Sequence, residues 1–123
     1  MGGWDEKETQ DKIFKYSLDT QQTSFVGFLP QKVEGHTIEV IDAQLFIIGG
    51  FDGFGVTDKI VRVDLKTMKS EVLEEAKLTF KRENHTSSKI AGDVIVIAGG
   101  WNGSKSLESI EAFKYIPQTR SLE

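Results

Sequence analysis

The sequence contains no cysteine, so disulfides and cysteine-based catalysis are excluded. It also lacks any apolar run that approaches the roughly 18 residues needed to span a membrane as a helix. The stretch from Asp5 to Asp11 is polar and acidic, which is not typical of a secretory signal peptide. These absences predict a protein of the cytoplasm with no membrane partner.

An excess of positive charge is absent as well. The chain has 15 Lys and Arg residues against 19 Asp and Glu, and its formal charge is −4. Binding to nucleic acid needs a net basic face. We therefore expect no nucleic-acid partner, and the local cluster of Lys59, Arg62, Lys66 and Lys69 is more typical of a solvated face.

What the chain does contain is one stretch that repeats. It reads LFIIGGF at 45–51 and VIVIAGGW at 94–101, and its tail, GGW, occurs a third time at 2–4. The copies are spaced by 47 and 50 residues. Self-similarity at a period of this length is typical of a propeller or a solenoid.

Each copy predicts a strand and also how that strand ends. A short run rich in Ile and Val is typical of a strand buried on both faces. The glycine pair that ends it permits positive φ or a close backbone approach. The dipeptides Asp52-Gly53 and Asn102-Gly103 then predict tight turns. The order of the units predicts further strands at 12–16, 24–29, 36–41, 58–64, 71–74 and 110–115.

The segment 68–80 allows an alternative, because Val72, Ala76 and Phe80 fall at helical spacing. The repeat favours a strand here. Four short strands in a unit of about 50 residues make one propeller blade. We therefore predict an all-β chain with a partial blade of two outer strands at 1–30, a complete blade at 31–80 and a partial blade of three strands at 81–123.

The sequence resembles the kelch-repeat family in the glycine pairs at 49–50 and 99–100 with their apolar lead-ins, in the stretch RENHT at 82–86, and in the strand that ends at Tyr115. The resemblance implies a fragment of a kelch-type β-propeller with four-stranded antiparallel blades. Family repeats usually carry a Tyr after the glycine pair and then a Trp. Tyr16 and Tyr115 keep the first of these, Val63 replaces it in the middle unit, and the Trp is absent.

About two and a half blades cannot close a ring, because propellers generally need about four to eight. A stack of blades with an open apolar face at each end normally needs capping. We therefore expect a fragment of a longer protein or one part of an assembly, able to associate with itself through the open blade faces.

A metal site and a catalytic site are not expected. Similar propellers of the galactose-oxidase type bind copper through Tyr and His, but His36 and His85 occupy equivalent places in successive units. Their positions are explained by the repeat, and the cysteine of the crosslinked tyrosine in that enzyme is missing. No phosphate loop, nucleophile elbow or paired carboxylates stand out. We expect no cofactor and no enzyme activity.

Loops held by a rigid scaffold are the remaining candidates, because binding residues concentrate there. In kelch proteins such loops gather on one face, and Arg side chains often hold acidic peptides through their two-pronged contact with a carboxylate. An alternative is that Phe51 and Trp101 pack against neighbouring blades. The candidate partner-binding residues are Phe51, Asp52, Phe54, Arg82, Glu83, Asn84, Trp101, Asn102 and Ser104.

The resemblance implies a protein-interaction module. Related propellers serve as substrate-recognition parts of cullin ubiquitin ligases joined to a BTB domain, and others bind actin. The alternative from another class is a fragment of a kelch-type enzyme, such as a sialic acid epimerase or a plant specifier protein. A truncated product without independent function is a third interpretation. An enzyme would show converging titratable groups in a cavity, whereas a binding module would show an aromatic and Arg-bearing face.

Overall fold

The computed structural model describes all residues from 1 to 123 and consists of strands, turns and loops with no helix. It therefore contains no helix long and apolar enough to cross a membrane. The strands are β1 (Lys12–Ser17), β2 (Gln22–Phe28), β3 (Thr37–Ile41), β4 (Gln44–Ile48), β5 (Lys59–Asp64), β6 (Ser70–Lys77), β7 (Thr86–Ile90), β8 (Val94–Ala98), β9 (Ile110–Ile116) and β10 (Ser121–Leu122).

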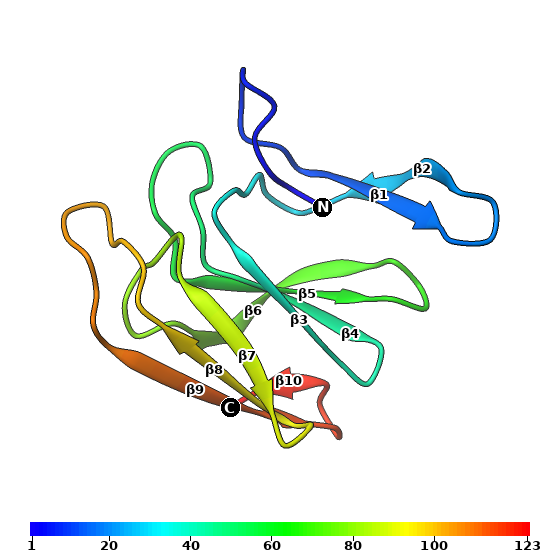
Figure 1. The fold of residues 1–123 in the computed structure, drawn as a ribbon. Coiled ribbons are helices and arrows are strands. Elements are labelled where there is room, and N and C mark those ends of the chain that lie inside the picture. The colour runs from blue at the N-terminus through cyan, green and yellow to red at the C-terminus, as the bar shows by residue number, and fades with distance from the viewer.

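The strands form three separate antiparallel sheets (Figure 1). Sheet 1 contains β1 and β2, sheet 2 has the order β3-β4-β5-β6, and sheet 3 has the order β7-β8-β9-β10. Within each sheet, every strand pairs with the next one along the chain, so sheet 1 is a hairpin and sheets 2 and 3 are simple meanders. Strands β3 and β7 contact each other at one edge of the sheets, and β6 and β10 at the opposite edge. The predicted all-β fragment of a propeller, with its ring not closed, is confirmed.

The segment after Met68, for which the sequence allows a strand or a helix, lies in sheet 2. Residues Ser70–Lys77 form β6, and Val61 pairs with Val72 across the β5–β6 ladder, so the prediction of a strand is confirmed. Neighbouring side chains along β6 therefore point to opposite faces: Val72 packs toward sheet 1, while Leu73 lies in the core shared with sheet 3.

Sheet 3 corrects the expected strand number. We predicted three strands for the last unit, but Ser121 pairs with Ile116 and Leu122 with Tyr115, so a short fourth strand is present. The chain reverses through a turn in which Arg120 has φ +54°. In the equivalent hairpins the values are similar, +55° at Gln21 and +59° at Met68. This turn brings Leu122 into the core, where it is 4% exposed.

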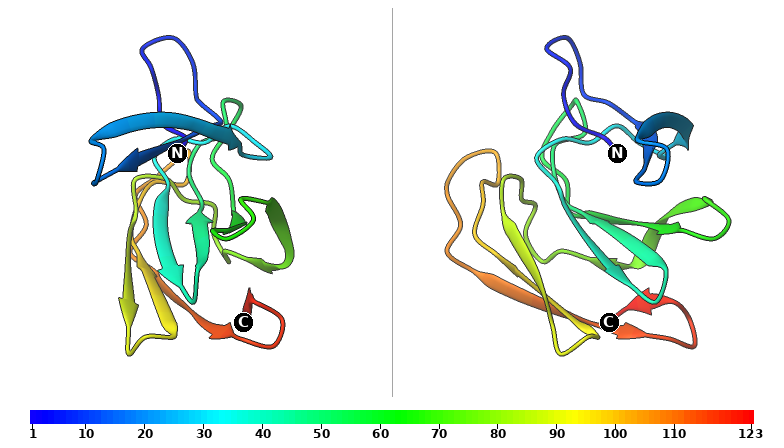
Figure 2. Two further views of the ribbon diagram at one scale, coloured as in Figure 1. Left: turned by 90° about the vertical axis from the view of Figure 1, so that its right-hand side faces the viewer. Right: turned by 45° about the vertical axis from the view of Figure 1, so that its right-hand side comes forward.

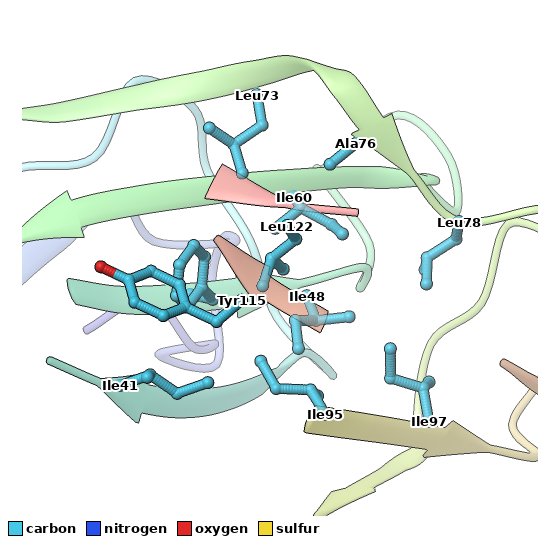
Figure 3. Packing of buried hydrophobic residues seen from close by; sticks show 11 residues of the cluster. Ile41, Ile48, Ile60, Leu73, Ala76, Leu78, Ile95, Ile97, Tyr115 and Leu122 are labelled. Atoms are coloured by element: carbon cyan, nitrogen blue, oxygen red, sulfur yellow. The ribbon is translucent and has the colours of Figure 1, made fainter. Parts of the chain in front are cut away.

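The core lies in two layers on either side of sheet 2. Because side chains alternate along a strand, Phe46 and Ile48 of β4 point toward sheet 3, while Leu45 and Ile47 point toward sheet 1. Figure 3 shows the layer between sheets 2 and 3, in which the ring of Tyr115 meets that of Phe46 edge to face with centroids 6.0 Å apart. The layer between sheets 1 and 2 contains Ile13, Leu29, Val33, Leu45, Ile47, Val61 and Val63.

The two glycine-ended strands differ in burial. Every residue of β4 is buried, as predicted for a strand covered on both faces. In β8 only Ile95 and Ile97 are buried, whereas Val94, Val96 and Ala98 are half-buried. The prediction of burial on both faces is therefore wrong for β8, because sheet 2 covers one of its faces and nothing in this chain covers the other.

The glycine pairs are required by a close backbone approach. Gly50 has φ +104°, and a Cβ added to it would lie 2.6 Å from the carbonyl oxygen of Glu34. Gly100 has φ +93°, with the same spacing from the carbonyl of Glu83. The N–H of Gly50 also donates to the carbonyl of Arg82 at 2.8 Å, which links sheet 2 to the segment that enters sheet 3. The pair thus marks the position where successive units meet.

Candidate protein-binding face

Three loops of one design extend from the same end of the molecule, each directly after a glycine pair (Figures 1 and 2). We name their residues, 4–9, 51–56 and 101–106, together the loop face. In each loop the chain pairs with itself at its base, through Trp4 with Thr9, Phe51 with Val56, and Trp101 with Ser106.

A single side-chain oxygen stiffens each loop. The Oδ1 of Asp52 accepts the N–H groups of Phe54 at 2.8 Å and of Gly55 at 2.9 Å. The Oδ1 of Asn102 accepts those of Ser104 and Lys105, both at 2.8 Å. These are Asx turns, in which a side chain replaces a backbone acceptor and fixes the turn. Asp52 and Asn102 are thus organising residues of the loops.

The first loop contains the same device. The Oδ1 of Asp5 accepts the N–H groups of Lys7 at 3.0 Å and of Glu8 at 2.9 Å. These hydrogen bonds, from Glu8 first and then Lys7, lower the pKa of Asp5 because they favour its charged form. We had not included this loop among the candidates, although its tail GGW repeats that of the other two units and was the signal that could have identified it.

Large aromatic side chains stand on this face. Phe54 is 98% exposed at the tip of the second loop, Trp4 is 60% exposed and Trp101 is 40% exposed. Phe51 is half-buried, and its backbone forms two hydrogen bonds with that of Glu34, at 2.9 and 2.7 Å. Of the candidate residues, Phe51 and Trp101 therefore have part of their surface covered at the base of their loops. Phe54, in contrast, is almost fully exposed to solvent. Exposed aromatic rings on a rigid base are typical of contact surfaces between proteins.

A hollow of about 380 Å³ separates the first and second loops. Lys32 and Glu8 form an ion pair of 2.8 Å on its wall, so the wall carries charges of both signs. The hollow is lined by Trp4, Lys7, Glu8, Thr9, Lys32, Glu34, Phe51, Asp52, Gly53 and Phe54.

Arg82 does not belong to the loop face. Its side chain is fully buried, and its guanidinium donates to the carbonyls of Gly99 and Ser109, to the Ser109 hydroxyl, and to Glu111 at 2.9 Å. It therefore joins the entry of sheet 3 to the loop-proximal end of β9 and offers no surface to a partner. Val33 occupies the equivalent place, since the carbonyls of Val33 and Arg82 accept from Gly3 and Gly50. In the sequence, the alignment of Arg82 with the apolar Val33 was the signal that could have indicated that position 82 is buried.

Glu83, Asn84 and Ser104 lie around the third loop in different ways. Glu83 is half-buried and its backbone forms two hydrogen bonds with Trp101, at 2.9 and 2.8 Å. Burial, followed by the nearby carboxylate of Glu34, raises the pKa of Glu83. Asn84 and Ser104 are exposed. Of the candidate residues, the structure thus gathers Phe51, Asp52 and Phe54 in one loop and Trp101, Asn102 and Ser104 in the next.

Neither histidine is a free side chain of this face, because His85 is buried and His36 is half-buried. His85 is 5% exposed, and its Nε2 lies 3.0 Å from the hydroxyl of Thr37. Burial, and secondarily the charge of Arg82, lowers the pKa of His85 to about 4. Burial also lowers the pKa of His36. No three His, Asp or Glu side chains lie close enough together to hold a metal ion.

Comparison with known proteins gives one line of support. No protein-family model matches the chain. A "Kelch repeat and BTB domain-containing protein" of Caenorhabditis elegans is 30% identical over 123 aligned residues, which cover 94% of this chain and 21% of that protein. The chain thus spans about a fifth of the length of the relative it matches. This similarity supports a kelch-like repeat and, in general terms, a role in protein–protein interaction.

Proposed function

We propose that this chain is a protein-interaction module that binds a partner protein through the loop face. The observation that carries the proposal is the threefold recurrence of one loop at one end of the molecule. Each copy combines an aromatic residue after the glycine pair with an Asx turn that holds the loop in shape.

The three loops are already held in shape by internal hydrogen bonds before a partner binds. Ordering a mobile loop at an interface opposes association, and a loop already fixed by internal hydrogen bonds avoids most of that cost. The fully exposed ring of Phe54 and the partly exposed ring of Trp101 would gain the most from burial, because aromatic anchors dominate the energy of many interfaces. The loop face therefore combines rigidity with available apolar area.

The kind of partner follows from the charges of this face. An acidic peptide held by Arg82 is no longer favoured, because that side chain is buried. The cations available near the loops are Lys7, Lys32 and Lys105, and Lys32 is already paired with Glu8. We propose a protein partner bound mainly through aromatic contact, with one or two lysines donating hydrogen bonds to a carboxylate of the partner at the rim.

We further propose that the chain serves in the cytoplasm as the substrate-recognition part of a cullin ligase adaptor. The name of the C. elegans relative, which joins kelch repeats to a BTB domain, supports this assignment over actin binding. The same similarity favours an interaction module over catalysis. Actin binding is the alternative that the experiment below separates.

The test is capture of partners by immobilised protein, followed by mass spectrometry and by affinity measurement on each purified candidate. Phe54→Ser and Trp101→Ser are the test variants, and Leu18→Ser is the matched control, because Leu18 is 84% exposed on the outer β1–β2 hairpin. We expect each test variant to weaken binding at least about tenfold and the control to leave it unchanged. Co-sedimentation with actin filaments is measured in parallel.

Binding lost equally in the control, or retained in both test variants, would remove the loop face from the interaction. Co-sedimentation with filaments that depends on Phe54 would replace the adaptor proposal with actin binding. In both cases the measurement is made on variants whose far-ultraviolet circular dichroism matches that of the original chain.

A further inference from the structure

Sheet 3 carries an outward face that repeats a buried face of sheet 2. The N–H of Gly49 donates to Lys59 and that of Gly99 to Ser109, at 3.0 and 3.2 Å, so residues 60 and 110 are structurally equivalent. The ladders agree, because Ile48 pairs with Ile60 and Ala98 with Ile110. On this alignment Ile41, Phe46, Ile48 and Ile60 correspond to Ile90, Val96, Ala98 and Ile110.

Equivalent residues differ sharply in burial. Ile41 is 6% exposed and Ile60 is fully buried, because both pack against sheet 3 (Figure 3). Ile90 is 52% exposed and Ile110 is 69% exposed. We call this outward side of sheet 3 the tail face, defined by Ile90, Val96, Ala98 and Ile110. It has the chemistry of a face that packs on another sheet, but no sheet of this chain covers it.

The opposite end of the molecule shows the complementary situation. The N–H of Gly2 donates to Lys12 at 3.1 Å, which makes Phe14 equivalent to Val61 and Tyr16 equivalent to Val63. Val61 and Val63 are buried against sheet 1, whereas Phe14, Tyr16, Phe25 and Phe28 are between 52% and 59% exposed. Phe25 contacts both Phe14 and Phe28 edge to face. We call this aromatic set the head face.

Compared with the equivalent residues of sheet 2, the side chains of the tail face are smaller and those of the head face are larger. On the tail face, Val96 and Ala98 are smaller than the equivalent Phe46 and Ile48. On the head face, Phe14 and Tyr16 are larger than the equivalent Val61 and Val63. Close packing between sheets requires large residues on one side to meet small ones on the other. Each face therefore fits the other better than it fits a copy of itself.

From this we propose that a second copy of the chain docks head to tail, with the tail face of one copy packed against the head face of the other. The contact continues the packing that already joins sheet 2 to sheet 3 within the chain. It is a heterologous contact, since two different surfaces meet. The occupant of both faces is thus the same protein.

The expected assembly is a closed pair. Each chain carries two four-stranded sheets and one two-stranded sheet, so two chains bring six sheets around one axis. That number lies within the range of about four to eight blades found in propellers. A head-to-tail contact that closes after two copies uses both faces of each chain and leaves none free for growth. Phe54 and Trp101 lie on the loop face, outside both contact faces, so loss of dimerisation and loss of partner binding are separable.

The test is the molar mass of the full chain, measured by light scattering after gel filtration and by sedimentation over a wide range of concentration. We expect twice the chain mass of 13.7 kDa. Ile110→Asp blocks the tail face and Phe25→Asp blocks the head face, and each alone should raise the dimer dissociation constant at least about tenfold. Phe54→Asp, on the loop face and therefore outside both contact faces, is the control and should remain dimeric, because Phe54 is 98% exposed.

Mixing the two variants distinguishes this arrangement from others. Ile110→Asp retains its head face and Phe25→Asp retains its tail face, so an equimolar mixture should form a 1:1 complex at concentrations where neither variant associates alone. The proposal would be overturned by an original chain that stays monomeric at all concentrations or by a single variant that dimerises as tightly as the original chain. A mixture that associates no more tightly than either variant alone would overturn it as well. If either variant unfolds, the same mixing experiment is made with Ile90→Ser and Phe14→Ser, which remove apolar contact without placing a charge in it.

Discussion

At the scale of single residues, Arg82 shows how a buried charged side chain can link two sheets. It is fully buried, and its ion-pair partner Glu111 also accepts the N–H of Thr79 at 2.6 Å, with only 11% of the Glu111 side chain exposed. The guanidinium thereby satisfies the carbonyls of Gly99 and Ser109 at the junction of sheets 2 and 3. An arginine in this position stabilises the junction only while its acidic partner is present.

Arg82→Met should therefore lower the free energy of unfolding by about 3 kcal/mol, because the buried carboxylate of Glu111 loses its counter-charge. The double variant Arg82→Met with Glu111→Leu should recover most of that loss. Urea denaturation monitored by tryptophan fluorescence measures both. A single variant within 1 kcal/mol of the original, about the scale of an exposed ion pair, or a double variant less stable than the single one, would contradict the structural role.

His85 predicts a pH dependence of stability. Its pKa is about 4 in the folded chain and about 6.5 when unfolded, so the unfolded state takes up the proton first as the pH falls. The stabilisation is complete above about pH 6.5 and is lost as the pH falls toward 4, by at most about 3 kcal/mol. The lowered pKa of His36 acts in the same direction.

Unfolding midpoints in urea between these pH values measure this effect. His85→Gln retains a polar partner for Thr37 without a titrating ring, and its stability should depend less steeply on pH. An identical slope for the variant and the original chain would exclude His85 as the source.

At the scale of the structural elements, the glycine pair controls how one unit meets the next. Gly3 and Gly50 have nearly equal φ values of +102° and +104°. An added Cβ would meet nothing within 4 Å at Gly3, but it would lie 2.6 Å from the Glu34 carbonyl at Gly50. A substitution at Gly3 therefore measures the stability cost of placing a side chain at positive φ alone, whereas the same substitution at Gly50 adds the cost of steric crowding.

Gly3→Ala should cost about 1–2 kcal/mol of stability, the penalty for a side chain at positive φ. Gly50→Ala should cost about 1–3 kcal/mol more, because the strand end or the connection before β3 must move. Thermal and urea unfolding of the two variants provide the comparison. Equal losses would mean that the close approach at Gly50 relaxes without cost.

At the scale of the whole molecule, the position of a sheet in the stack decides what its residues contribute. Ile60 and Ile110 are the same residue type at equivalent positions, but one is fully buried and the other is 69% exposed. Burial rather than local structure distinguishes them, so their contributions to the stability of a single chain should differ widely.

Ile60→Ala should destabilise the chain by about 2–5 kcal/mol. Ile110→Ala, measured in dilute solution, should stay within about 0.5 kcal/mol of the original chain. At high concentration Ile110→Ala should weaken association instead, since it lies on the tail face. A large loss for Ile110→Ala in dilute solution would place its side chain in an intramolecular contact.

The sequence by itself determined the local structure of this protein. The runs of Ile and Val before each glycine pair specified strands at 45–48 and 94–97, and Asp52-Gly53 and Asn102-Gly103 specified the turns that follow. These features depend on residues close together in the chain, where alternation, positive φ and side-chain acceptors act over a few positions. The same local rules placed the candidate loop residues Phe54 and Asn102 in loops that do extend from the body.

Only the tertiary structure decided which faces are covered. Repeat alignment shows that Val96 is equivalent to Phe46, but it does not show that the side of sheet 3 carrying Val96 lacks a neighbouring sheet. In the same way, the sequence favours Arg82 as a partner contact, whereas the structure buries it against Ser109 and Glu111, which lie far along the chain. Burial arises from contacts between distant segments, so a pattern that repeats in the sequence need not repeat in the packing.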